Sequence, residues 1–238
     1  MSDSQQSDRV HELRALGYSP KQIARTLGVR PAEVTAVLSQ AAMENLAAAG
    51  RPPLVRCWVS GGWASGLTVH GHGEWPGLEV ARTTAGGLAS VLVARRHRYD
   101  KVSVCGYLVD VYCLGVKDTL GPRVMDEHDL IAFRKDYFGG YEAEPLAAPL
   151  ELAQQLVFGA VDYARGLGFE PHADYADVVG HLESQSAPCD IEFGRDGAPF
   201  FIQGPYDDAR GIMRTLDRTV GPDNYHFIMA LSMDELGA

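Results

Sequence analysis

Residues Gly86–Lys117 read GGLASVLVARRHRYDKVSVCGYLVDVYCLGVK. Within them, Ser90–Ala94 and Lys101–Val116 are rich in Val, Leu, Tyr and Cys, and the polar segment Arg95–Asp100 separates the two runs. β-branched and aromatic residues on both sides of a polar break predict a long β-hairpin. Alternate residues of the second run are apolar on both faces, so we expect a central strand that is covered on both sides.

The composition is ordinary for a globular protein, with 46% hydrophobic and 22% charged residues among 238. This length has room for a full hydrophobic core and a small additional domain. There is no run of about 18 apolar residues, and the polar start MSDSQQSDRV lacks the apolar segment of a secretory signal. The four cysteines show no CxxC spacing, which favours a reducing compartment over a disulfide framework. We therefore expect a cytoplasmic protein with no membrane span.

The net charge of −10 is unevenly distributed along the chain. Residues 1–56 hold seven Lys and Arg against five Asp and Glu, a balance of +2, whereas the remainder holds fourteen against twenty-six, a balance of −12. Because a phosphate backbone repels the acidic part, we expect any nucleic-acid contact near the N-terminus. The small positive balance predicts binding that is weak, sensitive to salt and strengthened by a homodimer.

Three short helices are predicted at the N-terminus. The first is amphipathic and spans Asp8–Leu16. Ser19 and Pro20 are favoured at the start of the second helix for backbone reasons. Gly28 supplies the left-handed residue that a tight turn between helices needs, and Arg30–Pro31 begins the third helix.

The stretch GYSPKQIARTLGVRPAEVTAVLSQA (17–41) resembles the tri-helical helix-turn-helix of resolvases, transposases and sigma-factor-like regulators. The small residue Ala24, the turn residue Gly28 and the apolar residue Ile23 stand where that motif requires them. The resemblance covers about Val10–Ala42. It implies that the third helix enters the major groove of DNA and that the second crosses the backbone.

The resemblance also implies which side chains contact DNA. Lys21 and Gln22 would touch the phosphate backbone, and positions on the third helix would face bases or phosphates. Because that face is poor in Arg and Asn, we expect little direct readout of bases. The full set of implied DNA-binding residues is Lys21, Gln22, Arg30, Ala32, Glu33, Thr35, Ala36 and Ser39.

Arg51–Pro53 breaks the third helix and is interpreted as a linker. We therefore predict a helix-turn-helix module at 8–50 and an acidic α+β domain at 54–238 with a central, mainly antiparallel sheet. In the second domain, Leu150–Leu167 has the pattern of a helix, and the pair Asp196–Gly197 indicates a β-hairpin. The stretches YLVDVYCLGVKD and FGRDGAPFFIQGPYDD are similar to bacterial helix-turn-helix proteins of unassigned function, which implies a class without a mechanism.

Asp110 is the most unusual side chain of the central run, because Leu108 and Tyr112 are its neighbours on one strand face. A buried carboxyl with a shifted pKa is a candidate for a functional site, so we consider a pocket around Asp110, Tyr112 and Cys113. The alternative is a structural carboxylate paired with an arginine such as Arg95. Cys113 has no His or Asp placed to activate it and is better explained as a buried apolar residue, so we assign no catalytic residue.

Two clusters contain histidine. His70 and His72 share a strand face near Glu74, and the segment 172–181 holds two His and two Asp residues. Neither cluster matches a metal signature with a defined number of ligands, so we predict no metal and no cofactor.

These observations predict a DNA-binding regulatory protein whose second domain dimerises or senses an effector. One alternative is an enzyme, a hydrolase or nucleotide-processing protein, that the helical module targets. Another is a module in which the helices bind protein. The basic run Arg95–Arg98 at the expected hairpin tip is either solvated or a second phosphate contact.

Overall fold

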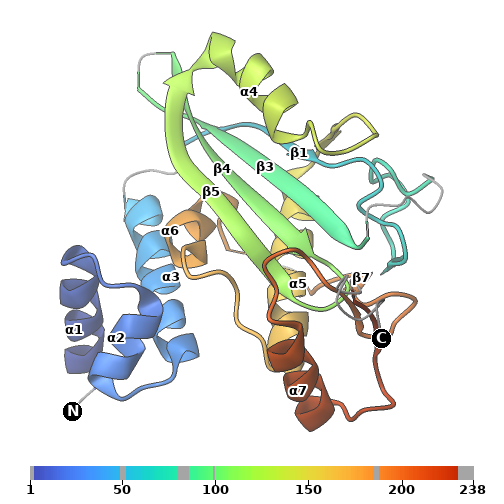
Figure 1. Cartoon of the computed structure of the whole chain (residues 1–238). Coiled ribbons are helices and arrows are strands. Elements are labelled where there is room, and N and C mark those ends of the chain that lie inside the picture. The colour runs from blue at the N-terminus through green and yellow to red at the C-terminus, as the bar shows by residue number, and fades with distance from the viewer. Residues whose placement is uncertain (1–2, 49–51, 80–85, 99, 185–187, 230–238) are drawn as a thin grey trace.

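The computed structural model describes residues 3–48, 52–79, 86–98, 100–184 and 188–229. Three N-terminal helices precede a domain built on a five-stranded sheet (Figure 1). This confirms the predicted α+β class. The strands of the sheet, in spatial order, are β5 (Gly115–Asp126), β4 (Lys101–Asp110), β3 (Leu88–Arg96), β1 (Leu54–Val59) and β6 (Leu146–Ala148), and all neighbours are antiparallel.

The predicted hairpin is present as β3 and β4, which lie in the middle of the sheet. Successive side chains of a strand point to opposite faces, and both faces of this hairpin are apolar. Val93 and Tyr107 belong to the core on one side, whereas Leu92 and Val104 belong to the core on the other side. All four side chains are fully buried, and burial of each stabilises the fold by about 1.5–3 kcal/mol.

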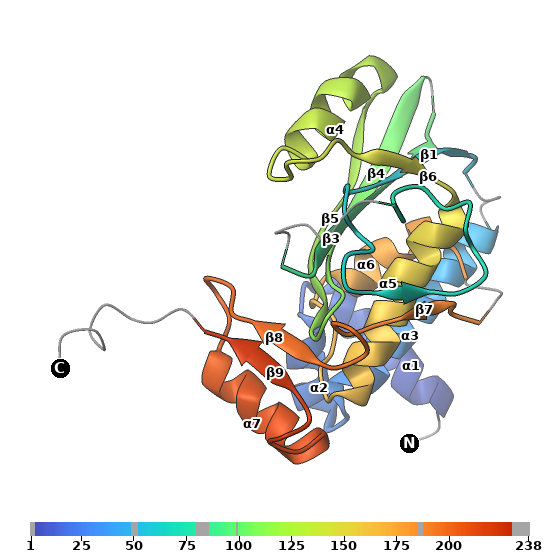
Figure 2. The ribbon, with the colours of Figure 1, turned by 90° about the vertical axis from the view of Figure 1, so that its right-hand side faces the viewer.

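Helices cover both faces of the sheet, giving three layers (Figure 2). The helix α4 (Leu130–Tyr137), which follows the 3-10 turn η1 (Glu127–Asp129), covers one face. The helices α5 (Leu150–Gly166) and α6 (Tyr175–Val178) cover the other face. The predicted helix at Leu150–Leu167 is thereby confirmed. The expectation that both faces of the central strand are covered is confirmed as well.

The second strand is shorter than predicted. It ends at Asp110, and residues 111–114 form a turn before β5 begins at Gly115, whose φ of 67° suits glycine. The carboxylate of Asp110 accepts hydrogen bonds from the backbone N–H groups of Tyr112 at 3.0 Å and Cys113 at 2.9 Å. The strand prediction to Val116 was wrong because this side chain closes a turn inside an apolar run that resembles a continuous strand.

The C-terminal part forms a smaller layer beside the end of the main sheet (Figure 2). Asp196 and Gly197 form the predicted tight turn, with φ values of 54° and 82°, between the bridged residues Arg195 and Ala198. The flanking strands do not pair as a hairpin, so that prediction was wrong. This layer consists of β8 (Phe200–Ile202) parallel to β9 (His226–Ile228), and of α7 (Ala209–Thr219). A separate two-stranded sheet pairs β2 (Thr68–Val69) with β7 (Ile191–Glu192) in antiparallel orientation.

The N-terminal helices pack against α6 and the 3-10 turn η2 (Val179–Leu182). Their small core includes Ala176 of α6, which is 2% exposed, and Arg14 forms an ion pair with Asp177. The module is thus docked on the second domain. Its helices are α1 (Asp3–Ala15), α2 (Pro20–Leu27) and α3 (Pro31–Ala48), and its core side chains are Val10, Leu13, Ile23, Ala24, Val34 and Leu38.

Arg95 lies within β3. The sequence pattern had placed it in the polar segment at the tip of the hairpin, and that prediction was wrong. The side chain is buried, and its Nε donates to the carbonyl of His181 at 2.7 Å. Its Nη1 donates to the carbonyl of Pro52 at 2.8 Å, and its Nη2 lies 2.6 Å from the carboxylate of Glu183. One buried guanidinium therefore joins the sheet, the start of the second domain and the η2 segment.

We predict that Arg95→Met lowers the free energy of unfolding by about 3–5 kcal/mol, because it leaves a carboxylate and two carbonyls without their donor. Arg98→Met, at the exposed hairpin tip, is the matched control and changes stability by about 0.5 kcal/mol or less. Urea unfolding of both variants measures the difference. Equal stability of the two variants would contradict this role of Arg95.

Candidate functional site

The start of α2 is fixed by reciprocal hydrogen bonds between Ser19 and Gln22. The backbone N–H of Ser19 donates to the side chain of Gln22 at 2.8 Å, and the backbone N–H of Gln22 donates to the Ser19 hydroxyl at 3.4 Å. Pro20 occupies the first helical position. These interactions satisfy backbone groups that a helix start leaves unpaired, so the N-terminus of α2 is well defined.

The connection between α2 and α3 has three residues, from Gly28 to Arg30. Gly28 has a φ of 69°, and its N–H donates to the carbonyl of Ala24. A short turn that contains glycine thus joins the two helices. The local chemistry of Ser19, Pro20 and Gly28 is thus the chemistry on which the sequence interpretation depended.

The implied DNA-binding residues differ in how accessible they are. The side chain of Arg30 is 82% exposed, although it also pairs with Glu33 at 2.7 Å. Thr35 is 8% exposed, and its hydroxyl donates to the carbonyl of Pro31 at 3.0 Å. In this arrangement Thr35 faces the interior of the protein. Of the remaining residues, Lys21, Gln22 and Ala36 are exposed, and Ala32, Glu33 and Ser39 are half-buried.

Sequence reasoning did not select Arg25, which lies one turn after Lys21 on α2. Residues four apart share one side of a helix, and both side chains are exposed. Within the described part of the chain, neither forms an ion pair. The four-residue spacing from Lys21 could have indicated from the sequence that Arg25 lies beside Lys21 on α2.

A cleft of about 580 Å³ separates the start of α3 from the second domain. Lys21 and Pro31 line it on the side of the helical module, and Lys117 and His172 line it on the opposite side. Lys117 is held by Asp207, with 2.6 Å between the amine and the carboxylate.

Asp110, Tyr112 and Cys113 are neighbours in space but do not form an open pocket. Their exposed fractions are 4%, 5% and 0%. Tyr112 donates its hydroxyl to the carbonyl of Ser65 at 2.6 Å, and burial raises the pKa of the Cys113 thiol. These contacts are those of a structural turn. The Asp110 carboxylate accepts hydrogen bonds from backbone N–H groups and does not pair with a described arginine such as Arg95, which was the alternative that the sequence left open.

Burial raises the pKa of Asp110 from 3.8 to about 6. The hydrogen bond from the Tyr112 backbone and the charge of Lys117 act in the opposite direction but are smaller. The carboxyl group is therefore harder to ionise in the folded chain than in the unfolded chain.

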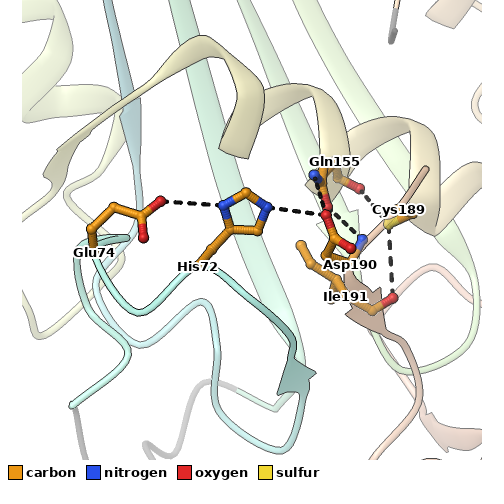
Figure 3. A network of polar contacts seen from close by, with 6 residues as sticks. All are labelled: His72, Glu74, Gln155, Cys189, Asp190 and Ile191. Carbon is orange, nitrogen blue, oxygen red and sulfur yellow. Dashed lines mark hydrogen bonds and ion pairs between the residues drawn. The ribbon is translucent and has the colours of Figure 1, made fainter. Parts of the chain in front are cut away.

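His72 lies between two carboxylates (Figure 3). Its Nε2 is 3.0 Å from Asp190 and its Nδ1 is 3.2 Å from Glu74. The ring stacks on Trp75 with 4.0 Å between the centroids. The hydrogen bond to Asp190 contributes most to raising the pKa of His72, and it lowers the pKa of Asp190 in turn.

The network continues from Asp190 into the core (Figure 3). Gln155 of α5 is fully buried, and its amide accepts from the backbone N–H of Asp190 at 2.7 Å. Cys189 contacts the carbonyl of Gln155 at 3.7 Å, and burial raises the pKa of its thiol. Both ring nitrogens of His72 contact carboxylates, and the Cys189 thiol contacts backbone carbonyls. The network therefore holds the loop of His72 against α5 and the start of β7.

The second histidine cluster is dispersed in the structure. His181 bonds to the hydroxyl of Ser103 at 2.9 Å, and burial lowers its pKa to about 4. Asp177 pairs with Arg14, and the backbone of His172 donates to the carbonyl of Val116. Over the described ranges, no three His, Cys, Asp or Glu side chains converge as ligands of one metal ion would.

No family model, no curated protein and no solved structure matches this chain. Its function must be argued from its own residues. Among the helices of the described ranges, none is both long and apolar enough to cross a membrane.

We predict that Asp110→Asn leaves the protein folded, because the amide oxygen can accept the same backbone hydrogen bonds. In the wild-type protein the raised pKa makes the free energy of unfolding fall as pH rises from about 4 to about 6, by on the order of 3 kcal/mol. The variant loses this pH dependence. Asp110→Ala removes the acceptor and costs about 1–3 kcal/mol. Urea unfolding across pH measures both, and an unfolded Asp110→Asn protein would refute this role.

We also predict that His72 stabilises the folded state more at low pH. A raised folded pKa means that the stabilisation is complete below the ordinary pKa of 6.5 and is lost as pH rises through the raised value. Melting temperatures of the wild-type and His72→Gln proteins should therefore converge with rising pH. Asp190→Asn should reduce the same pH dependence, because only Glu74 then remains as a hydrogen-bonded carboxylate, and an unchanged dependence in that variant would contradict the assigned pair.

Proposed function

We propose that this chain binds double-stranded DNA through its N-terminal helices and acts as a regulatory protein, with residues 54–238 as a dimerisation or effector-sensing domain. The observation that supports this best is the short connection between α2 and α3, with Gly28 at a φ of 69°. Lys21, Arg25 and Arg30 add three exposed cations on α2 and on this connection. Phosphate groups are the natural partners of such cations.

The docked position of α3 limits what it can read. Thr35 is buried, and the cleft at Pro31 faces the second domain. We therefore propose that contact in this arrangement is made mainly by α2 with the phosphate backbone. Base recognition by α3 requires the module to separate from α6, where Ala176 packs and Asp177 pairs with Arg14.

Binding that depends on three cations has a measurable signature. Each neutralised phosphate contributes about −0.9 to the slope of log K against log salt, so one copy should give a slope near −3. A homodimer would double the number of contacts. Analytical sedimentation of the protein without DNA shows whether it is a monomer or a homodimer.

We predict that Lys21→Glu combined with Arg25→Glu weakens binding to genomic DNA fragments and reduces the salt slope by about 2. The matched control is Arg210→Glu with Arg214→Glu, an exposed pair of the same spacing on α7. It should leave the slope unchanged. If both double variants bind as the wild type does, or if the wild type does not bind at all, the helices serve a protein contact instead.

A further inference from the structure

A second cleft, of about 620 Å³, lies between β1 and the start of α4. Three arginines line it, Arg56 from β1, Arg96 from β3 and Arg134 from α4. They gather there although residues 57–238 carry a balance of −12. We call this site the arginine cleft.

The three arginines differ in whether they pair with a carboxylate of the chain. Arg96 pairs with both carboxylate oxygens of Glu127, the one acidic side chain among the described residues that line the cleft. Arg56 and Arg134 form no ion pair with any residue that the structure describes. The Nε of Arg134 is buried and lacks a hydrogen-bond partner among those residues. An anion from outside the chain could therefore pair with Arg56 and Arg134 without displacing a carboxylate of a described residue.

The cleft is also preorganised and partly apolar. The guanidinium of Arg134 lies 5.6 Å from the ring centre of Trp58, which is 5% exposed, and this contact restrains its position. Leu54 and Ile131 line the same cleft and are 40% and 71% exposed. Apolar surface beside unpaired cations suits a ligand that carries both an anionic group and an apolar group.

We propose that the arginine cleft binds a small organic anion whose phosphate or carboxylate group pairs with Arg56 and Arg134 and whose apolar part covers Leu54 and Ile131. Arginine pairs with both kinds of anion through two parallel hydrogen bonds. The overall balance of −12 in residues 57–238 disfavours a long polyanion, whose charges would extend beyond the arginines. This site does not depend on the proposed DNA binding.

Nuclear magnetic resonance of the full-length protein tests the proposal directly. The side-chain N–H signals of Arg134 and Trp58 are followed while phenyl phosphate, benzoate or inorganic phosphate is added, with benzyl alcohol as the uncharged analogue. We expect saturable shifts of both signals with phenyl phosphate or benzoate, and the tighter of the two identifies the anionic group. Inorganic phosphate should bind more weakly because it covers no apolar surface.

Variants separate the cleft from general charge effects. Arg56→Met should weaken the binding of the better anion about tenfold or more and leave the fold intact, since Arg56 is exposed. Arg123→Met is the matched control, because Arg123 lies outside the cleft over the ring of Phe133. Three results would overturn the proposal: no saturation by about 10 mM anion, equal weakening in both variants, or a response to duplex DNA alone.

Discussion

The buried guanidinium of Arg95 joins three segments that lie far apart in the sequence. Two of its nitrogens donate to the carbonyls of Pro52 before the sheet and His181 in η2, and the third forms an ion pair with Glu183. Because α3 packs on η2 and on α6, the same charge also supports the surface that receives the helical module. A buried charge is favourable only when its partners are correctly placed, so this cluster ties the orientation of the module to the integrity of the sheet.

The docked position of the helical module determines which helix could contact DNA in the proposed function. Residues 57–238 supply the acidic balance of −12, so in the proposed function a duplex should approach from the side of Lys21 and Arg25. The cleft between Lys21 and His172 lies between the helical module and the second domain. Contact through α2 is compatible with the docked arrangement, whereas insertion of α3 into a groove is not. A regulatory domain acts by shifting such an equilibrium between two arrangements, in either direction.

What sequence reasoning could predict was local. Ser19, Pro20 and Gly28 act on their own backbone, and the β3–β4 hairpin follows from β-branched residues around a polar break. What it could not predict depends on partners distant in the chain. Asp190 meets His72 across 118 positions, and Arg95 looks like part of a solvated basic run until the sheet buries it. The arginine cleft joins Arg56 and Arg134 from separate elements, with no motif in the sequence. Asp110 is an intermediate case. Its hydrogen bonds are local, but the apolar residues around it are typical of a continuous strand and so conceal the turn.

The most direct test of the account is amide hydrogen exchange of the full-length protein with and without genomic DNA fragments at low salt. Contact through α2 predicts slower exchange in residues 19–30, where α2 and its connection to α3 lie, and unchanged exchange in the central strands β3 and β4. Exchange that is unchanged throughout, or protection confined to the segments around Arg56 and Arg134, would contradict DNA binding by the N-terminal helices.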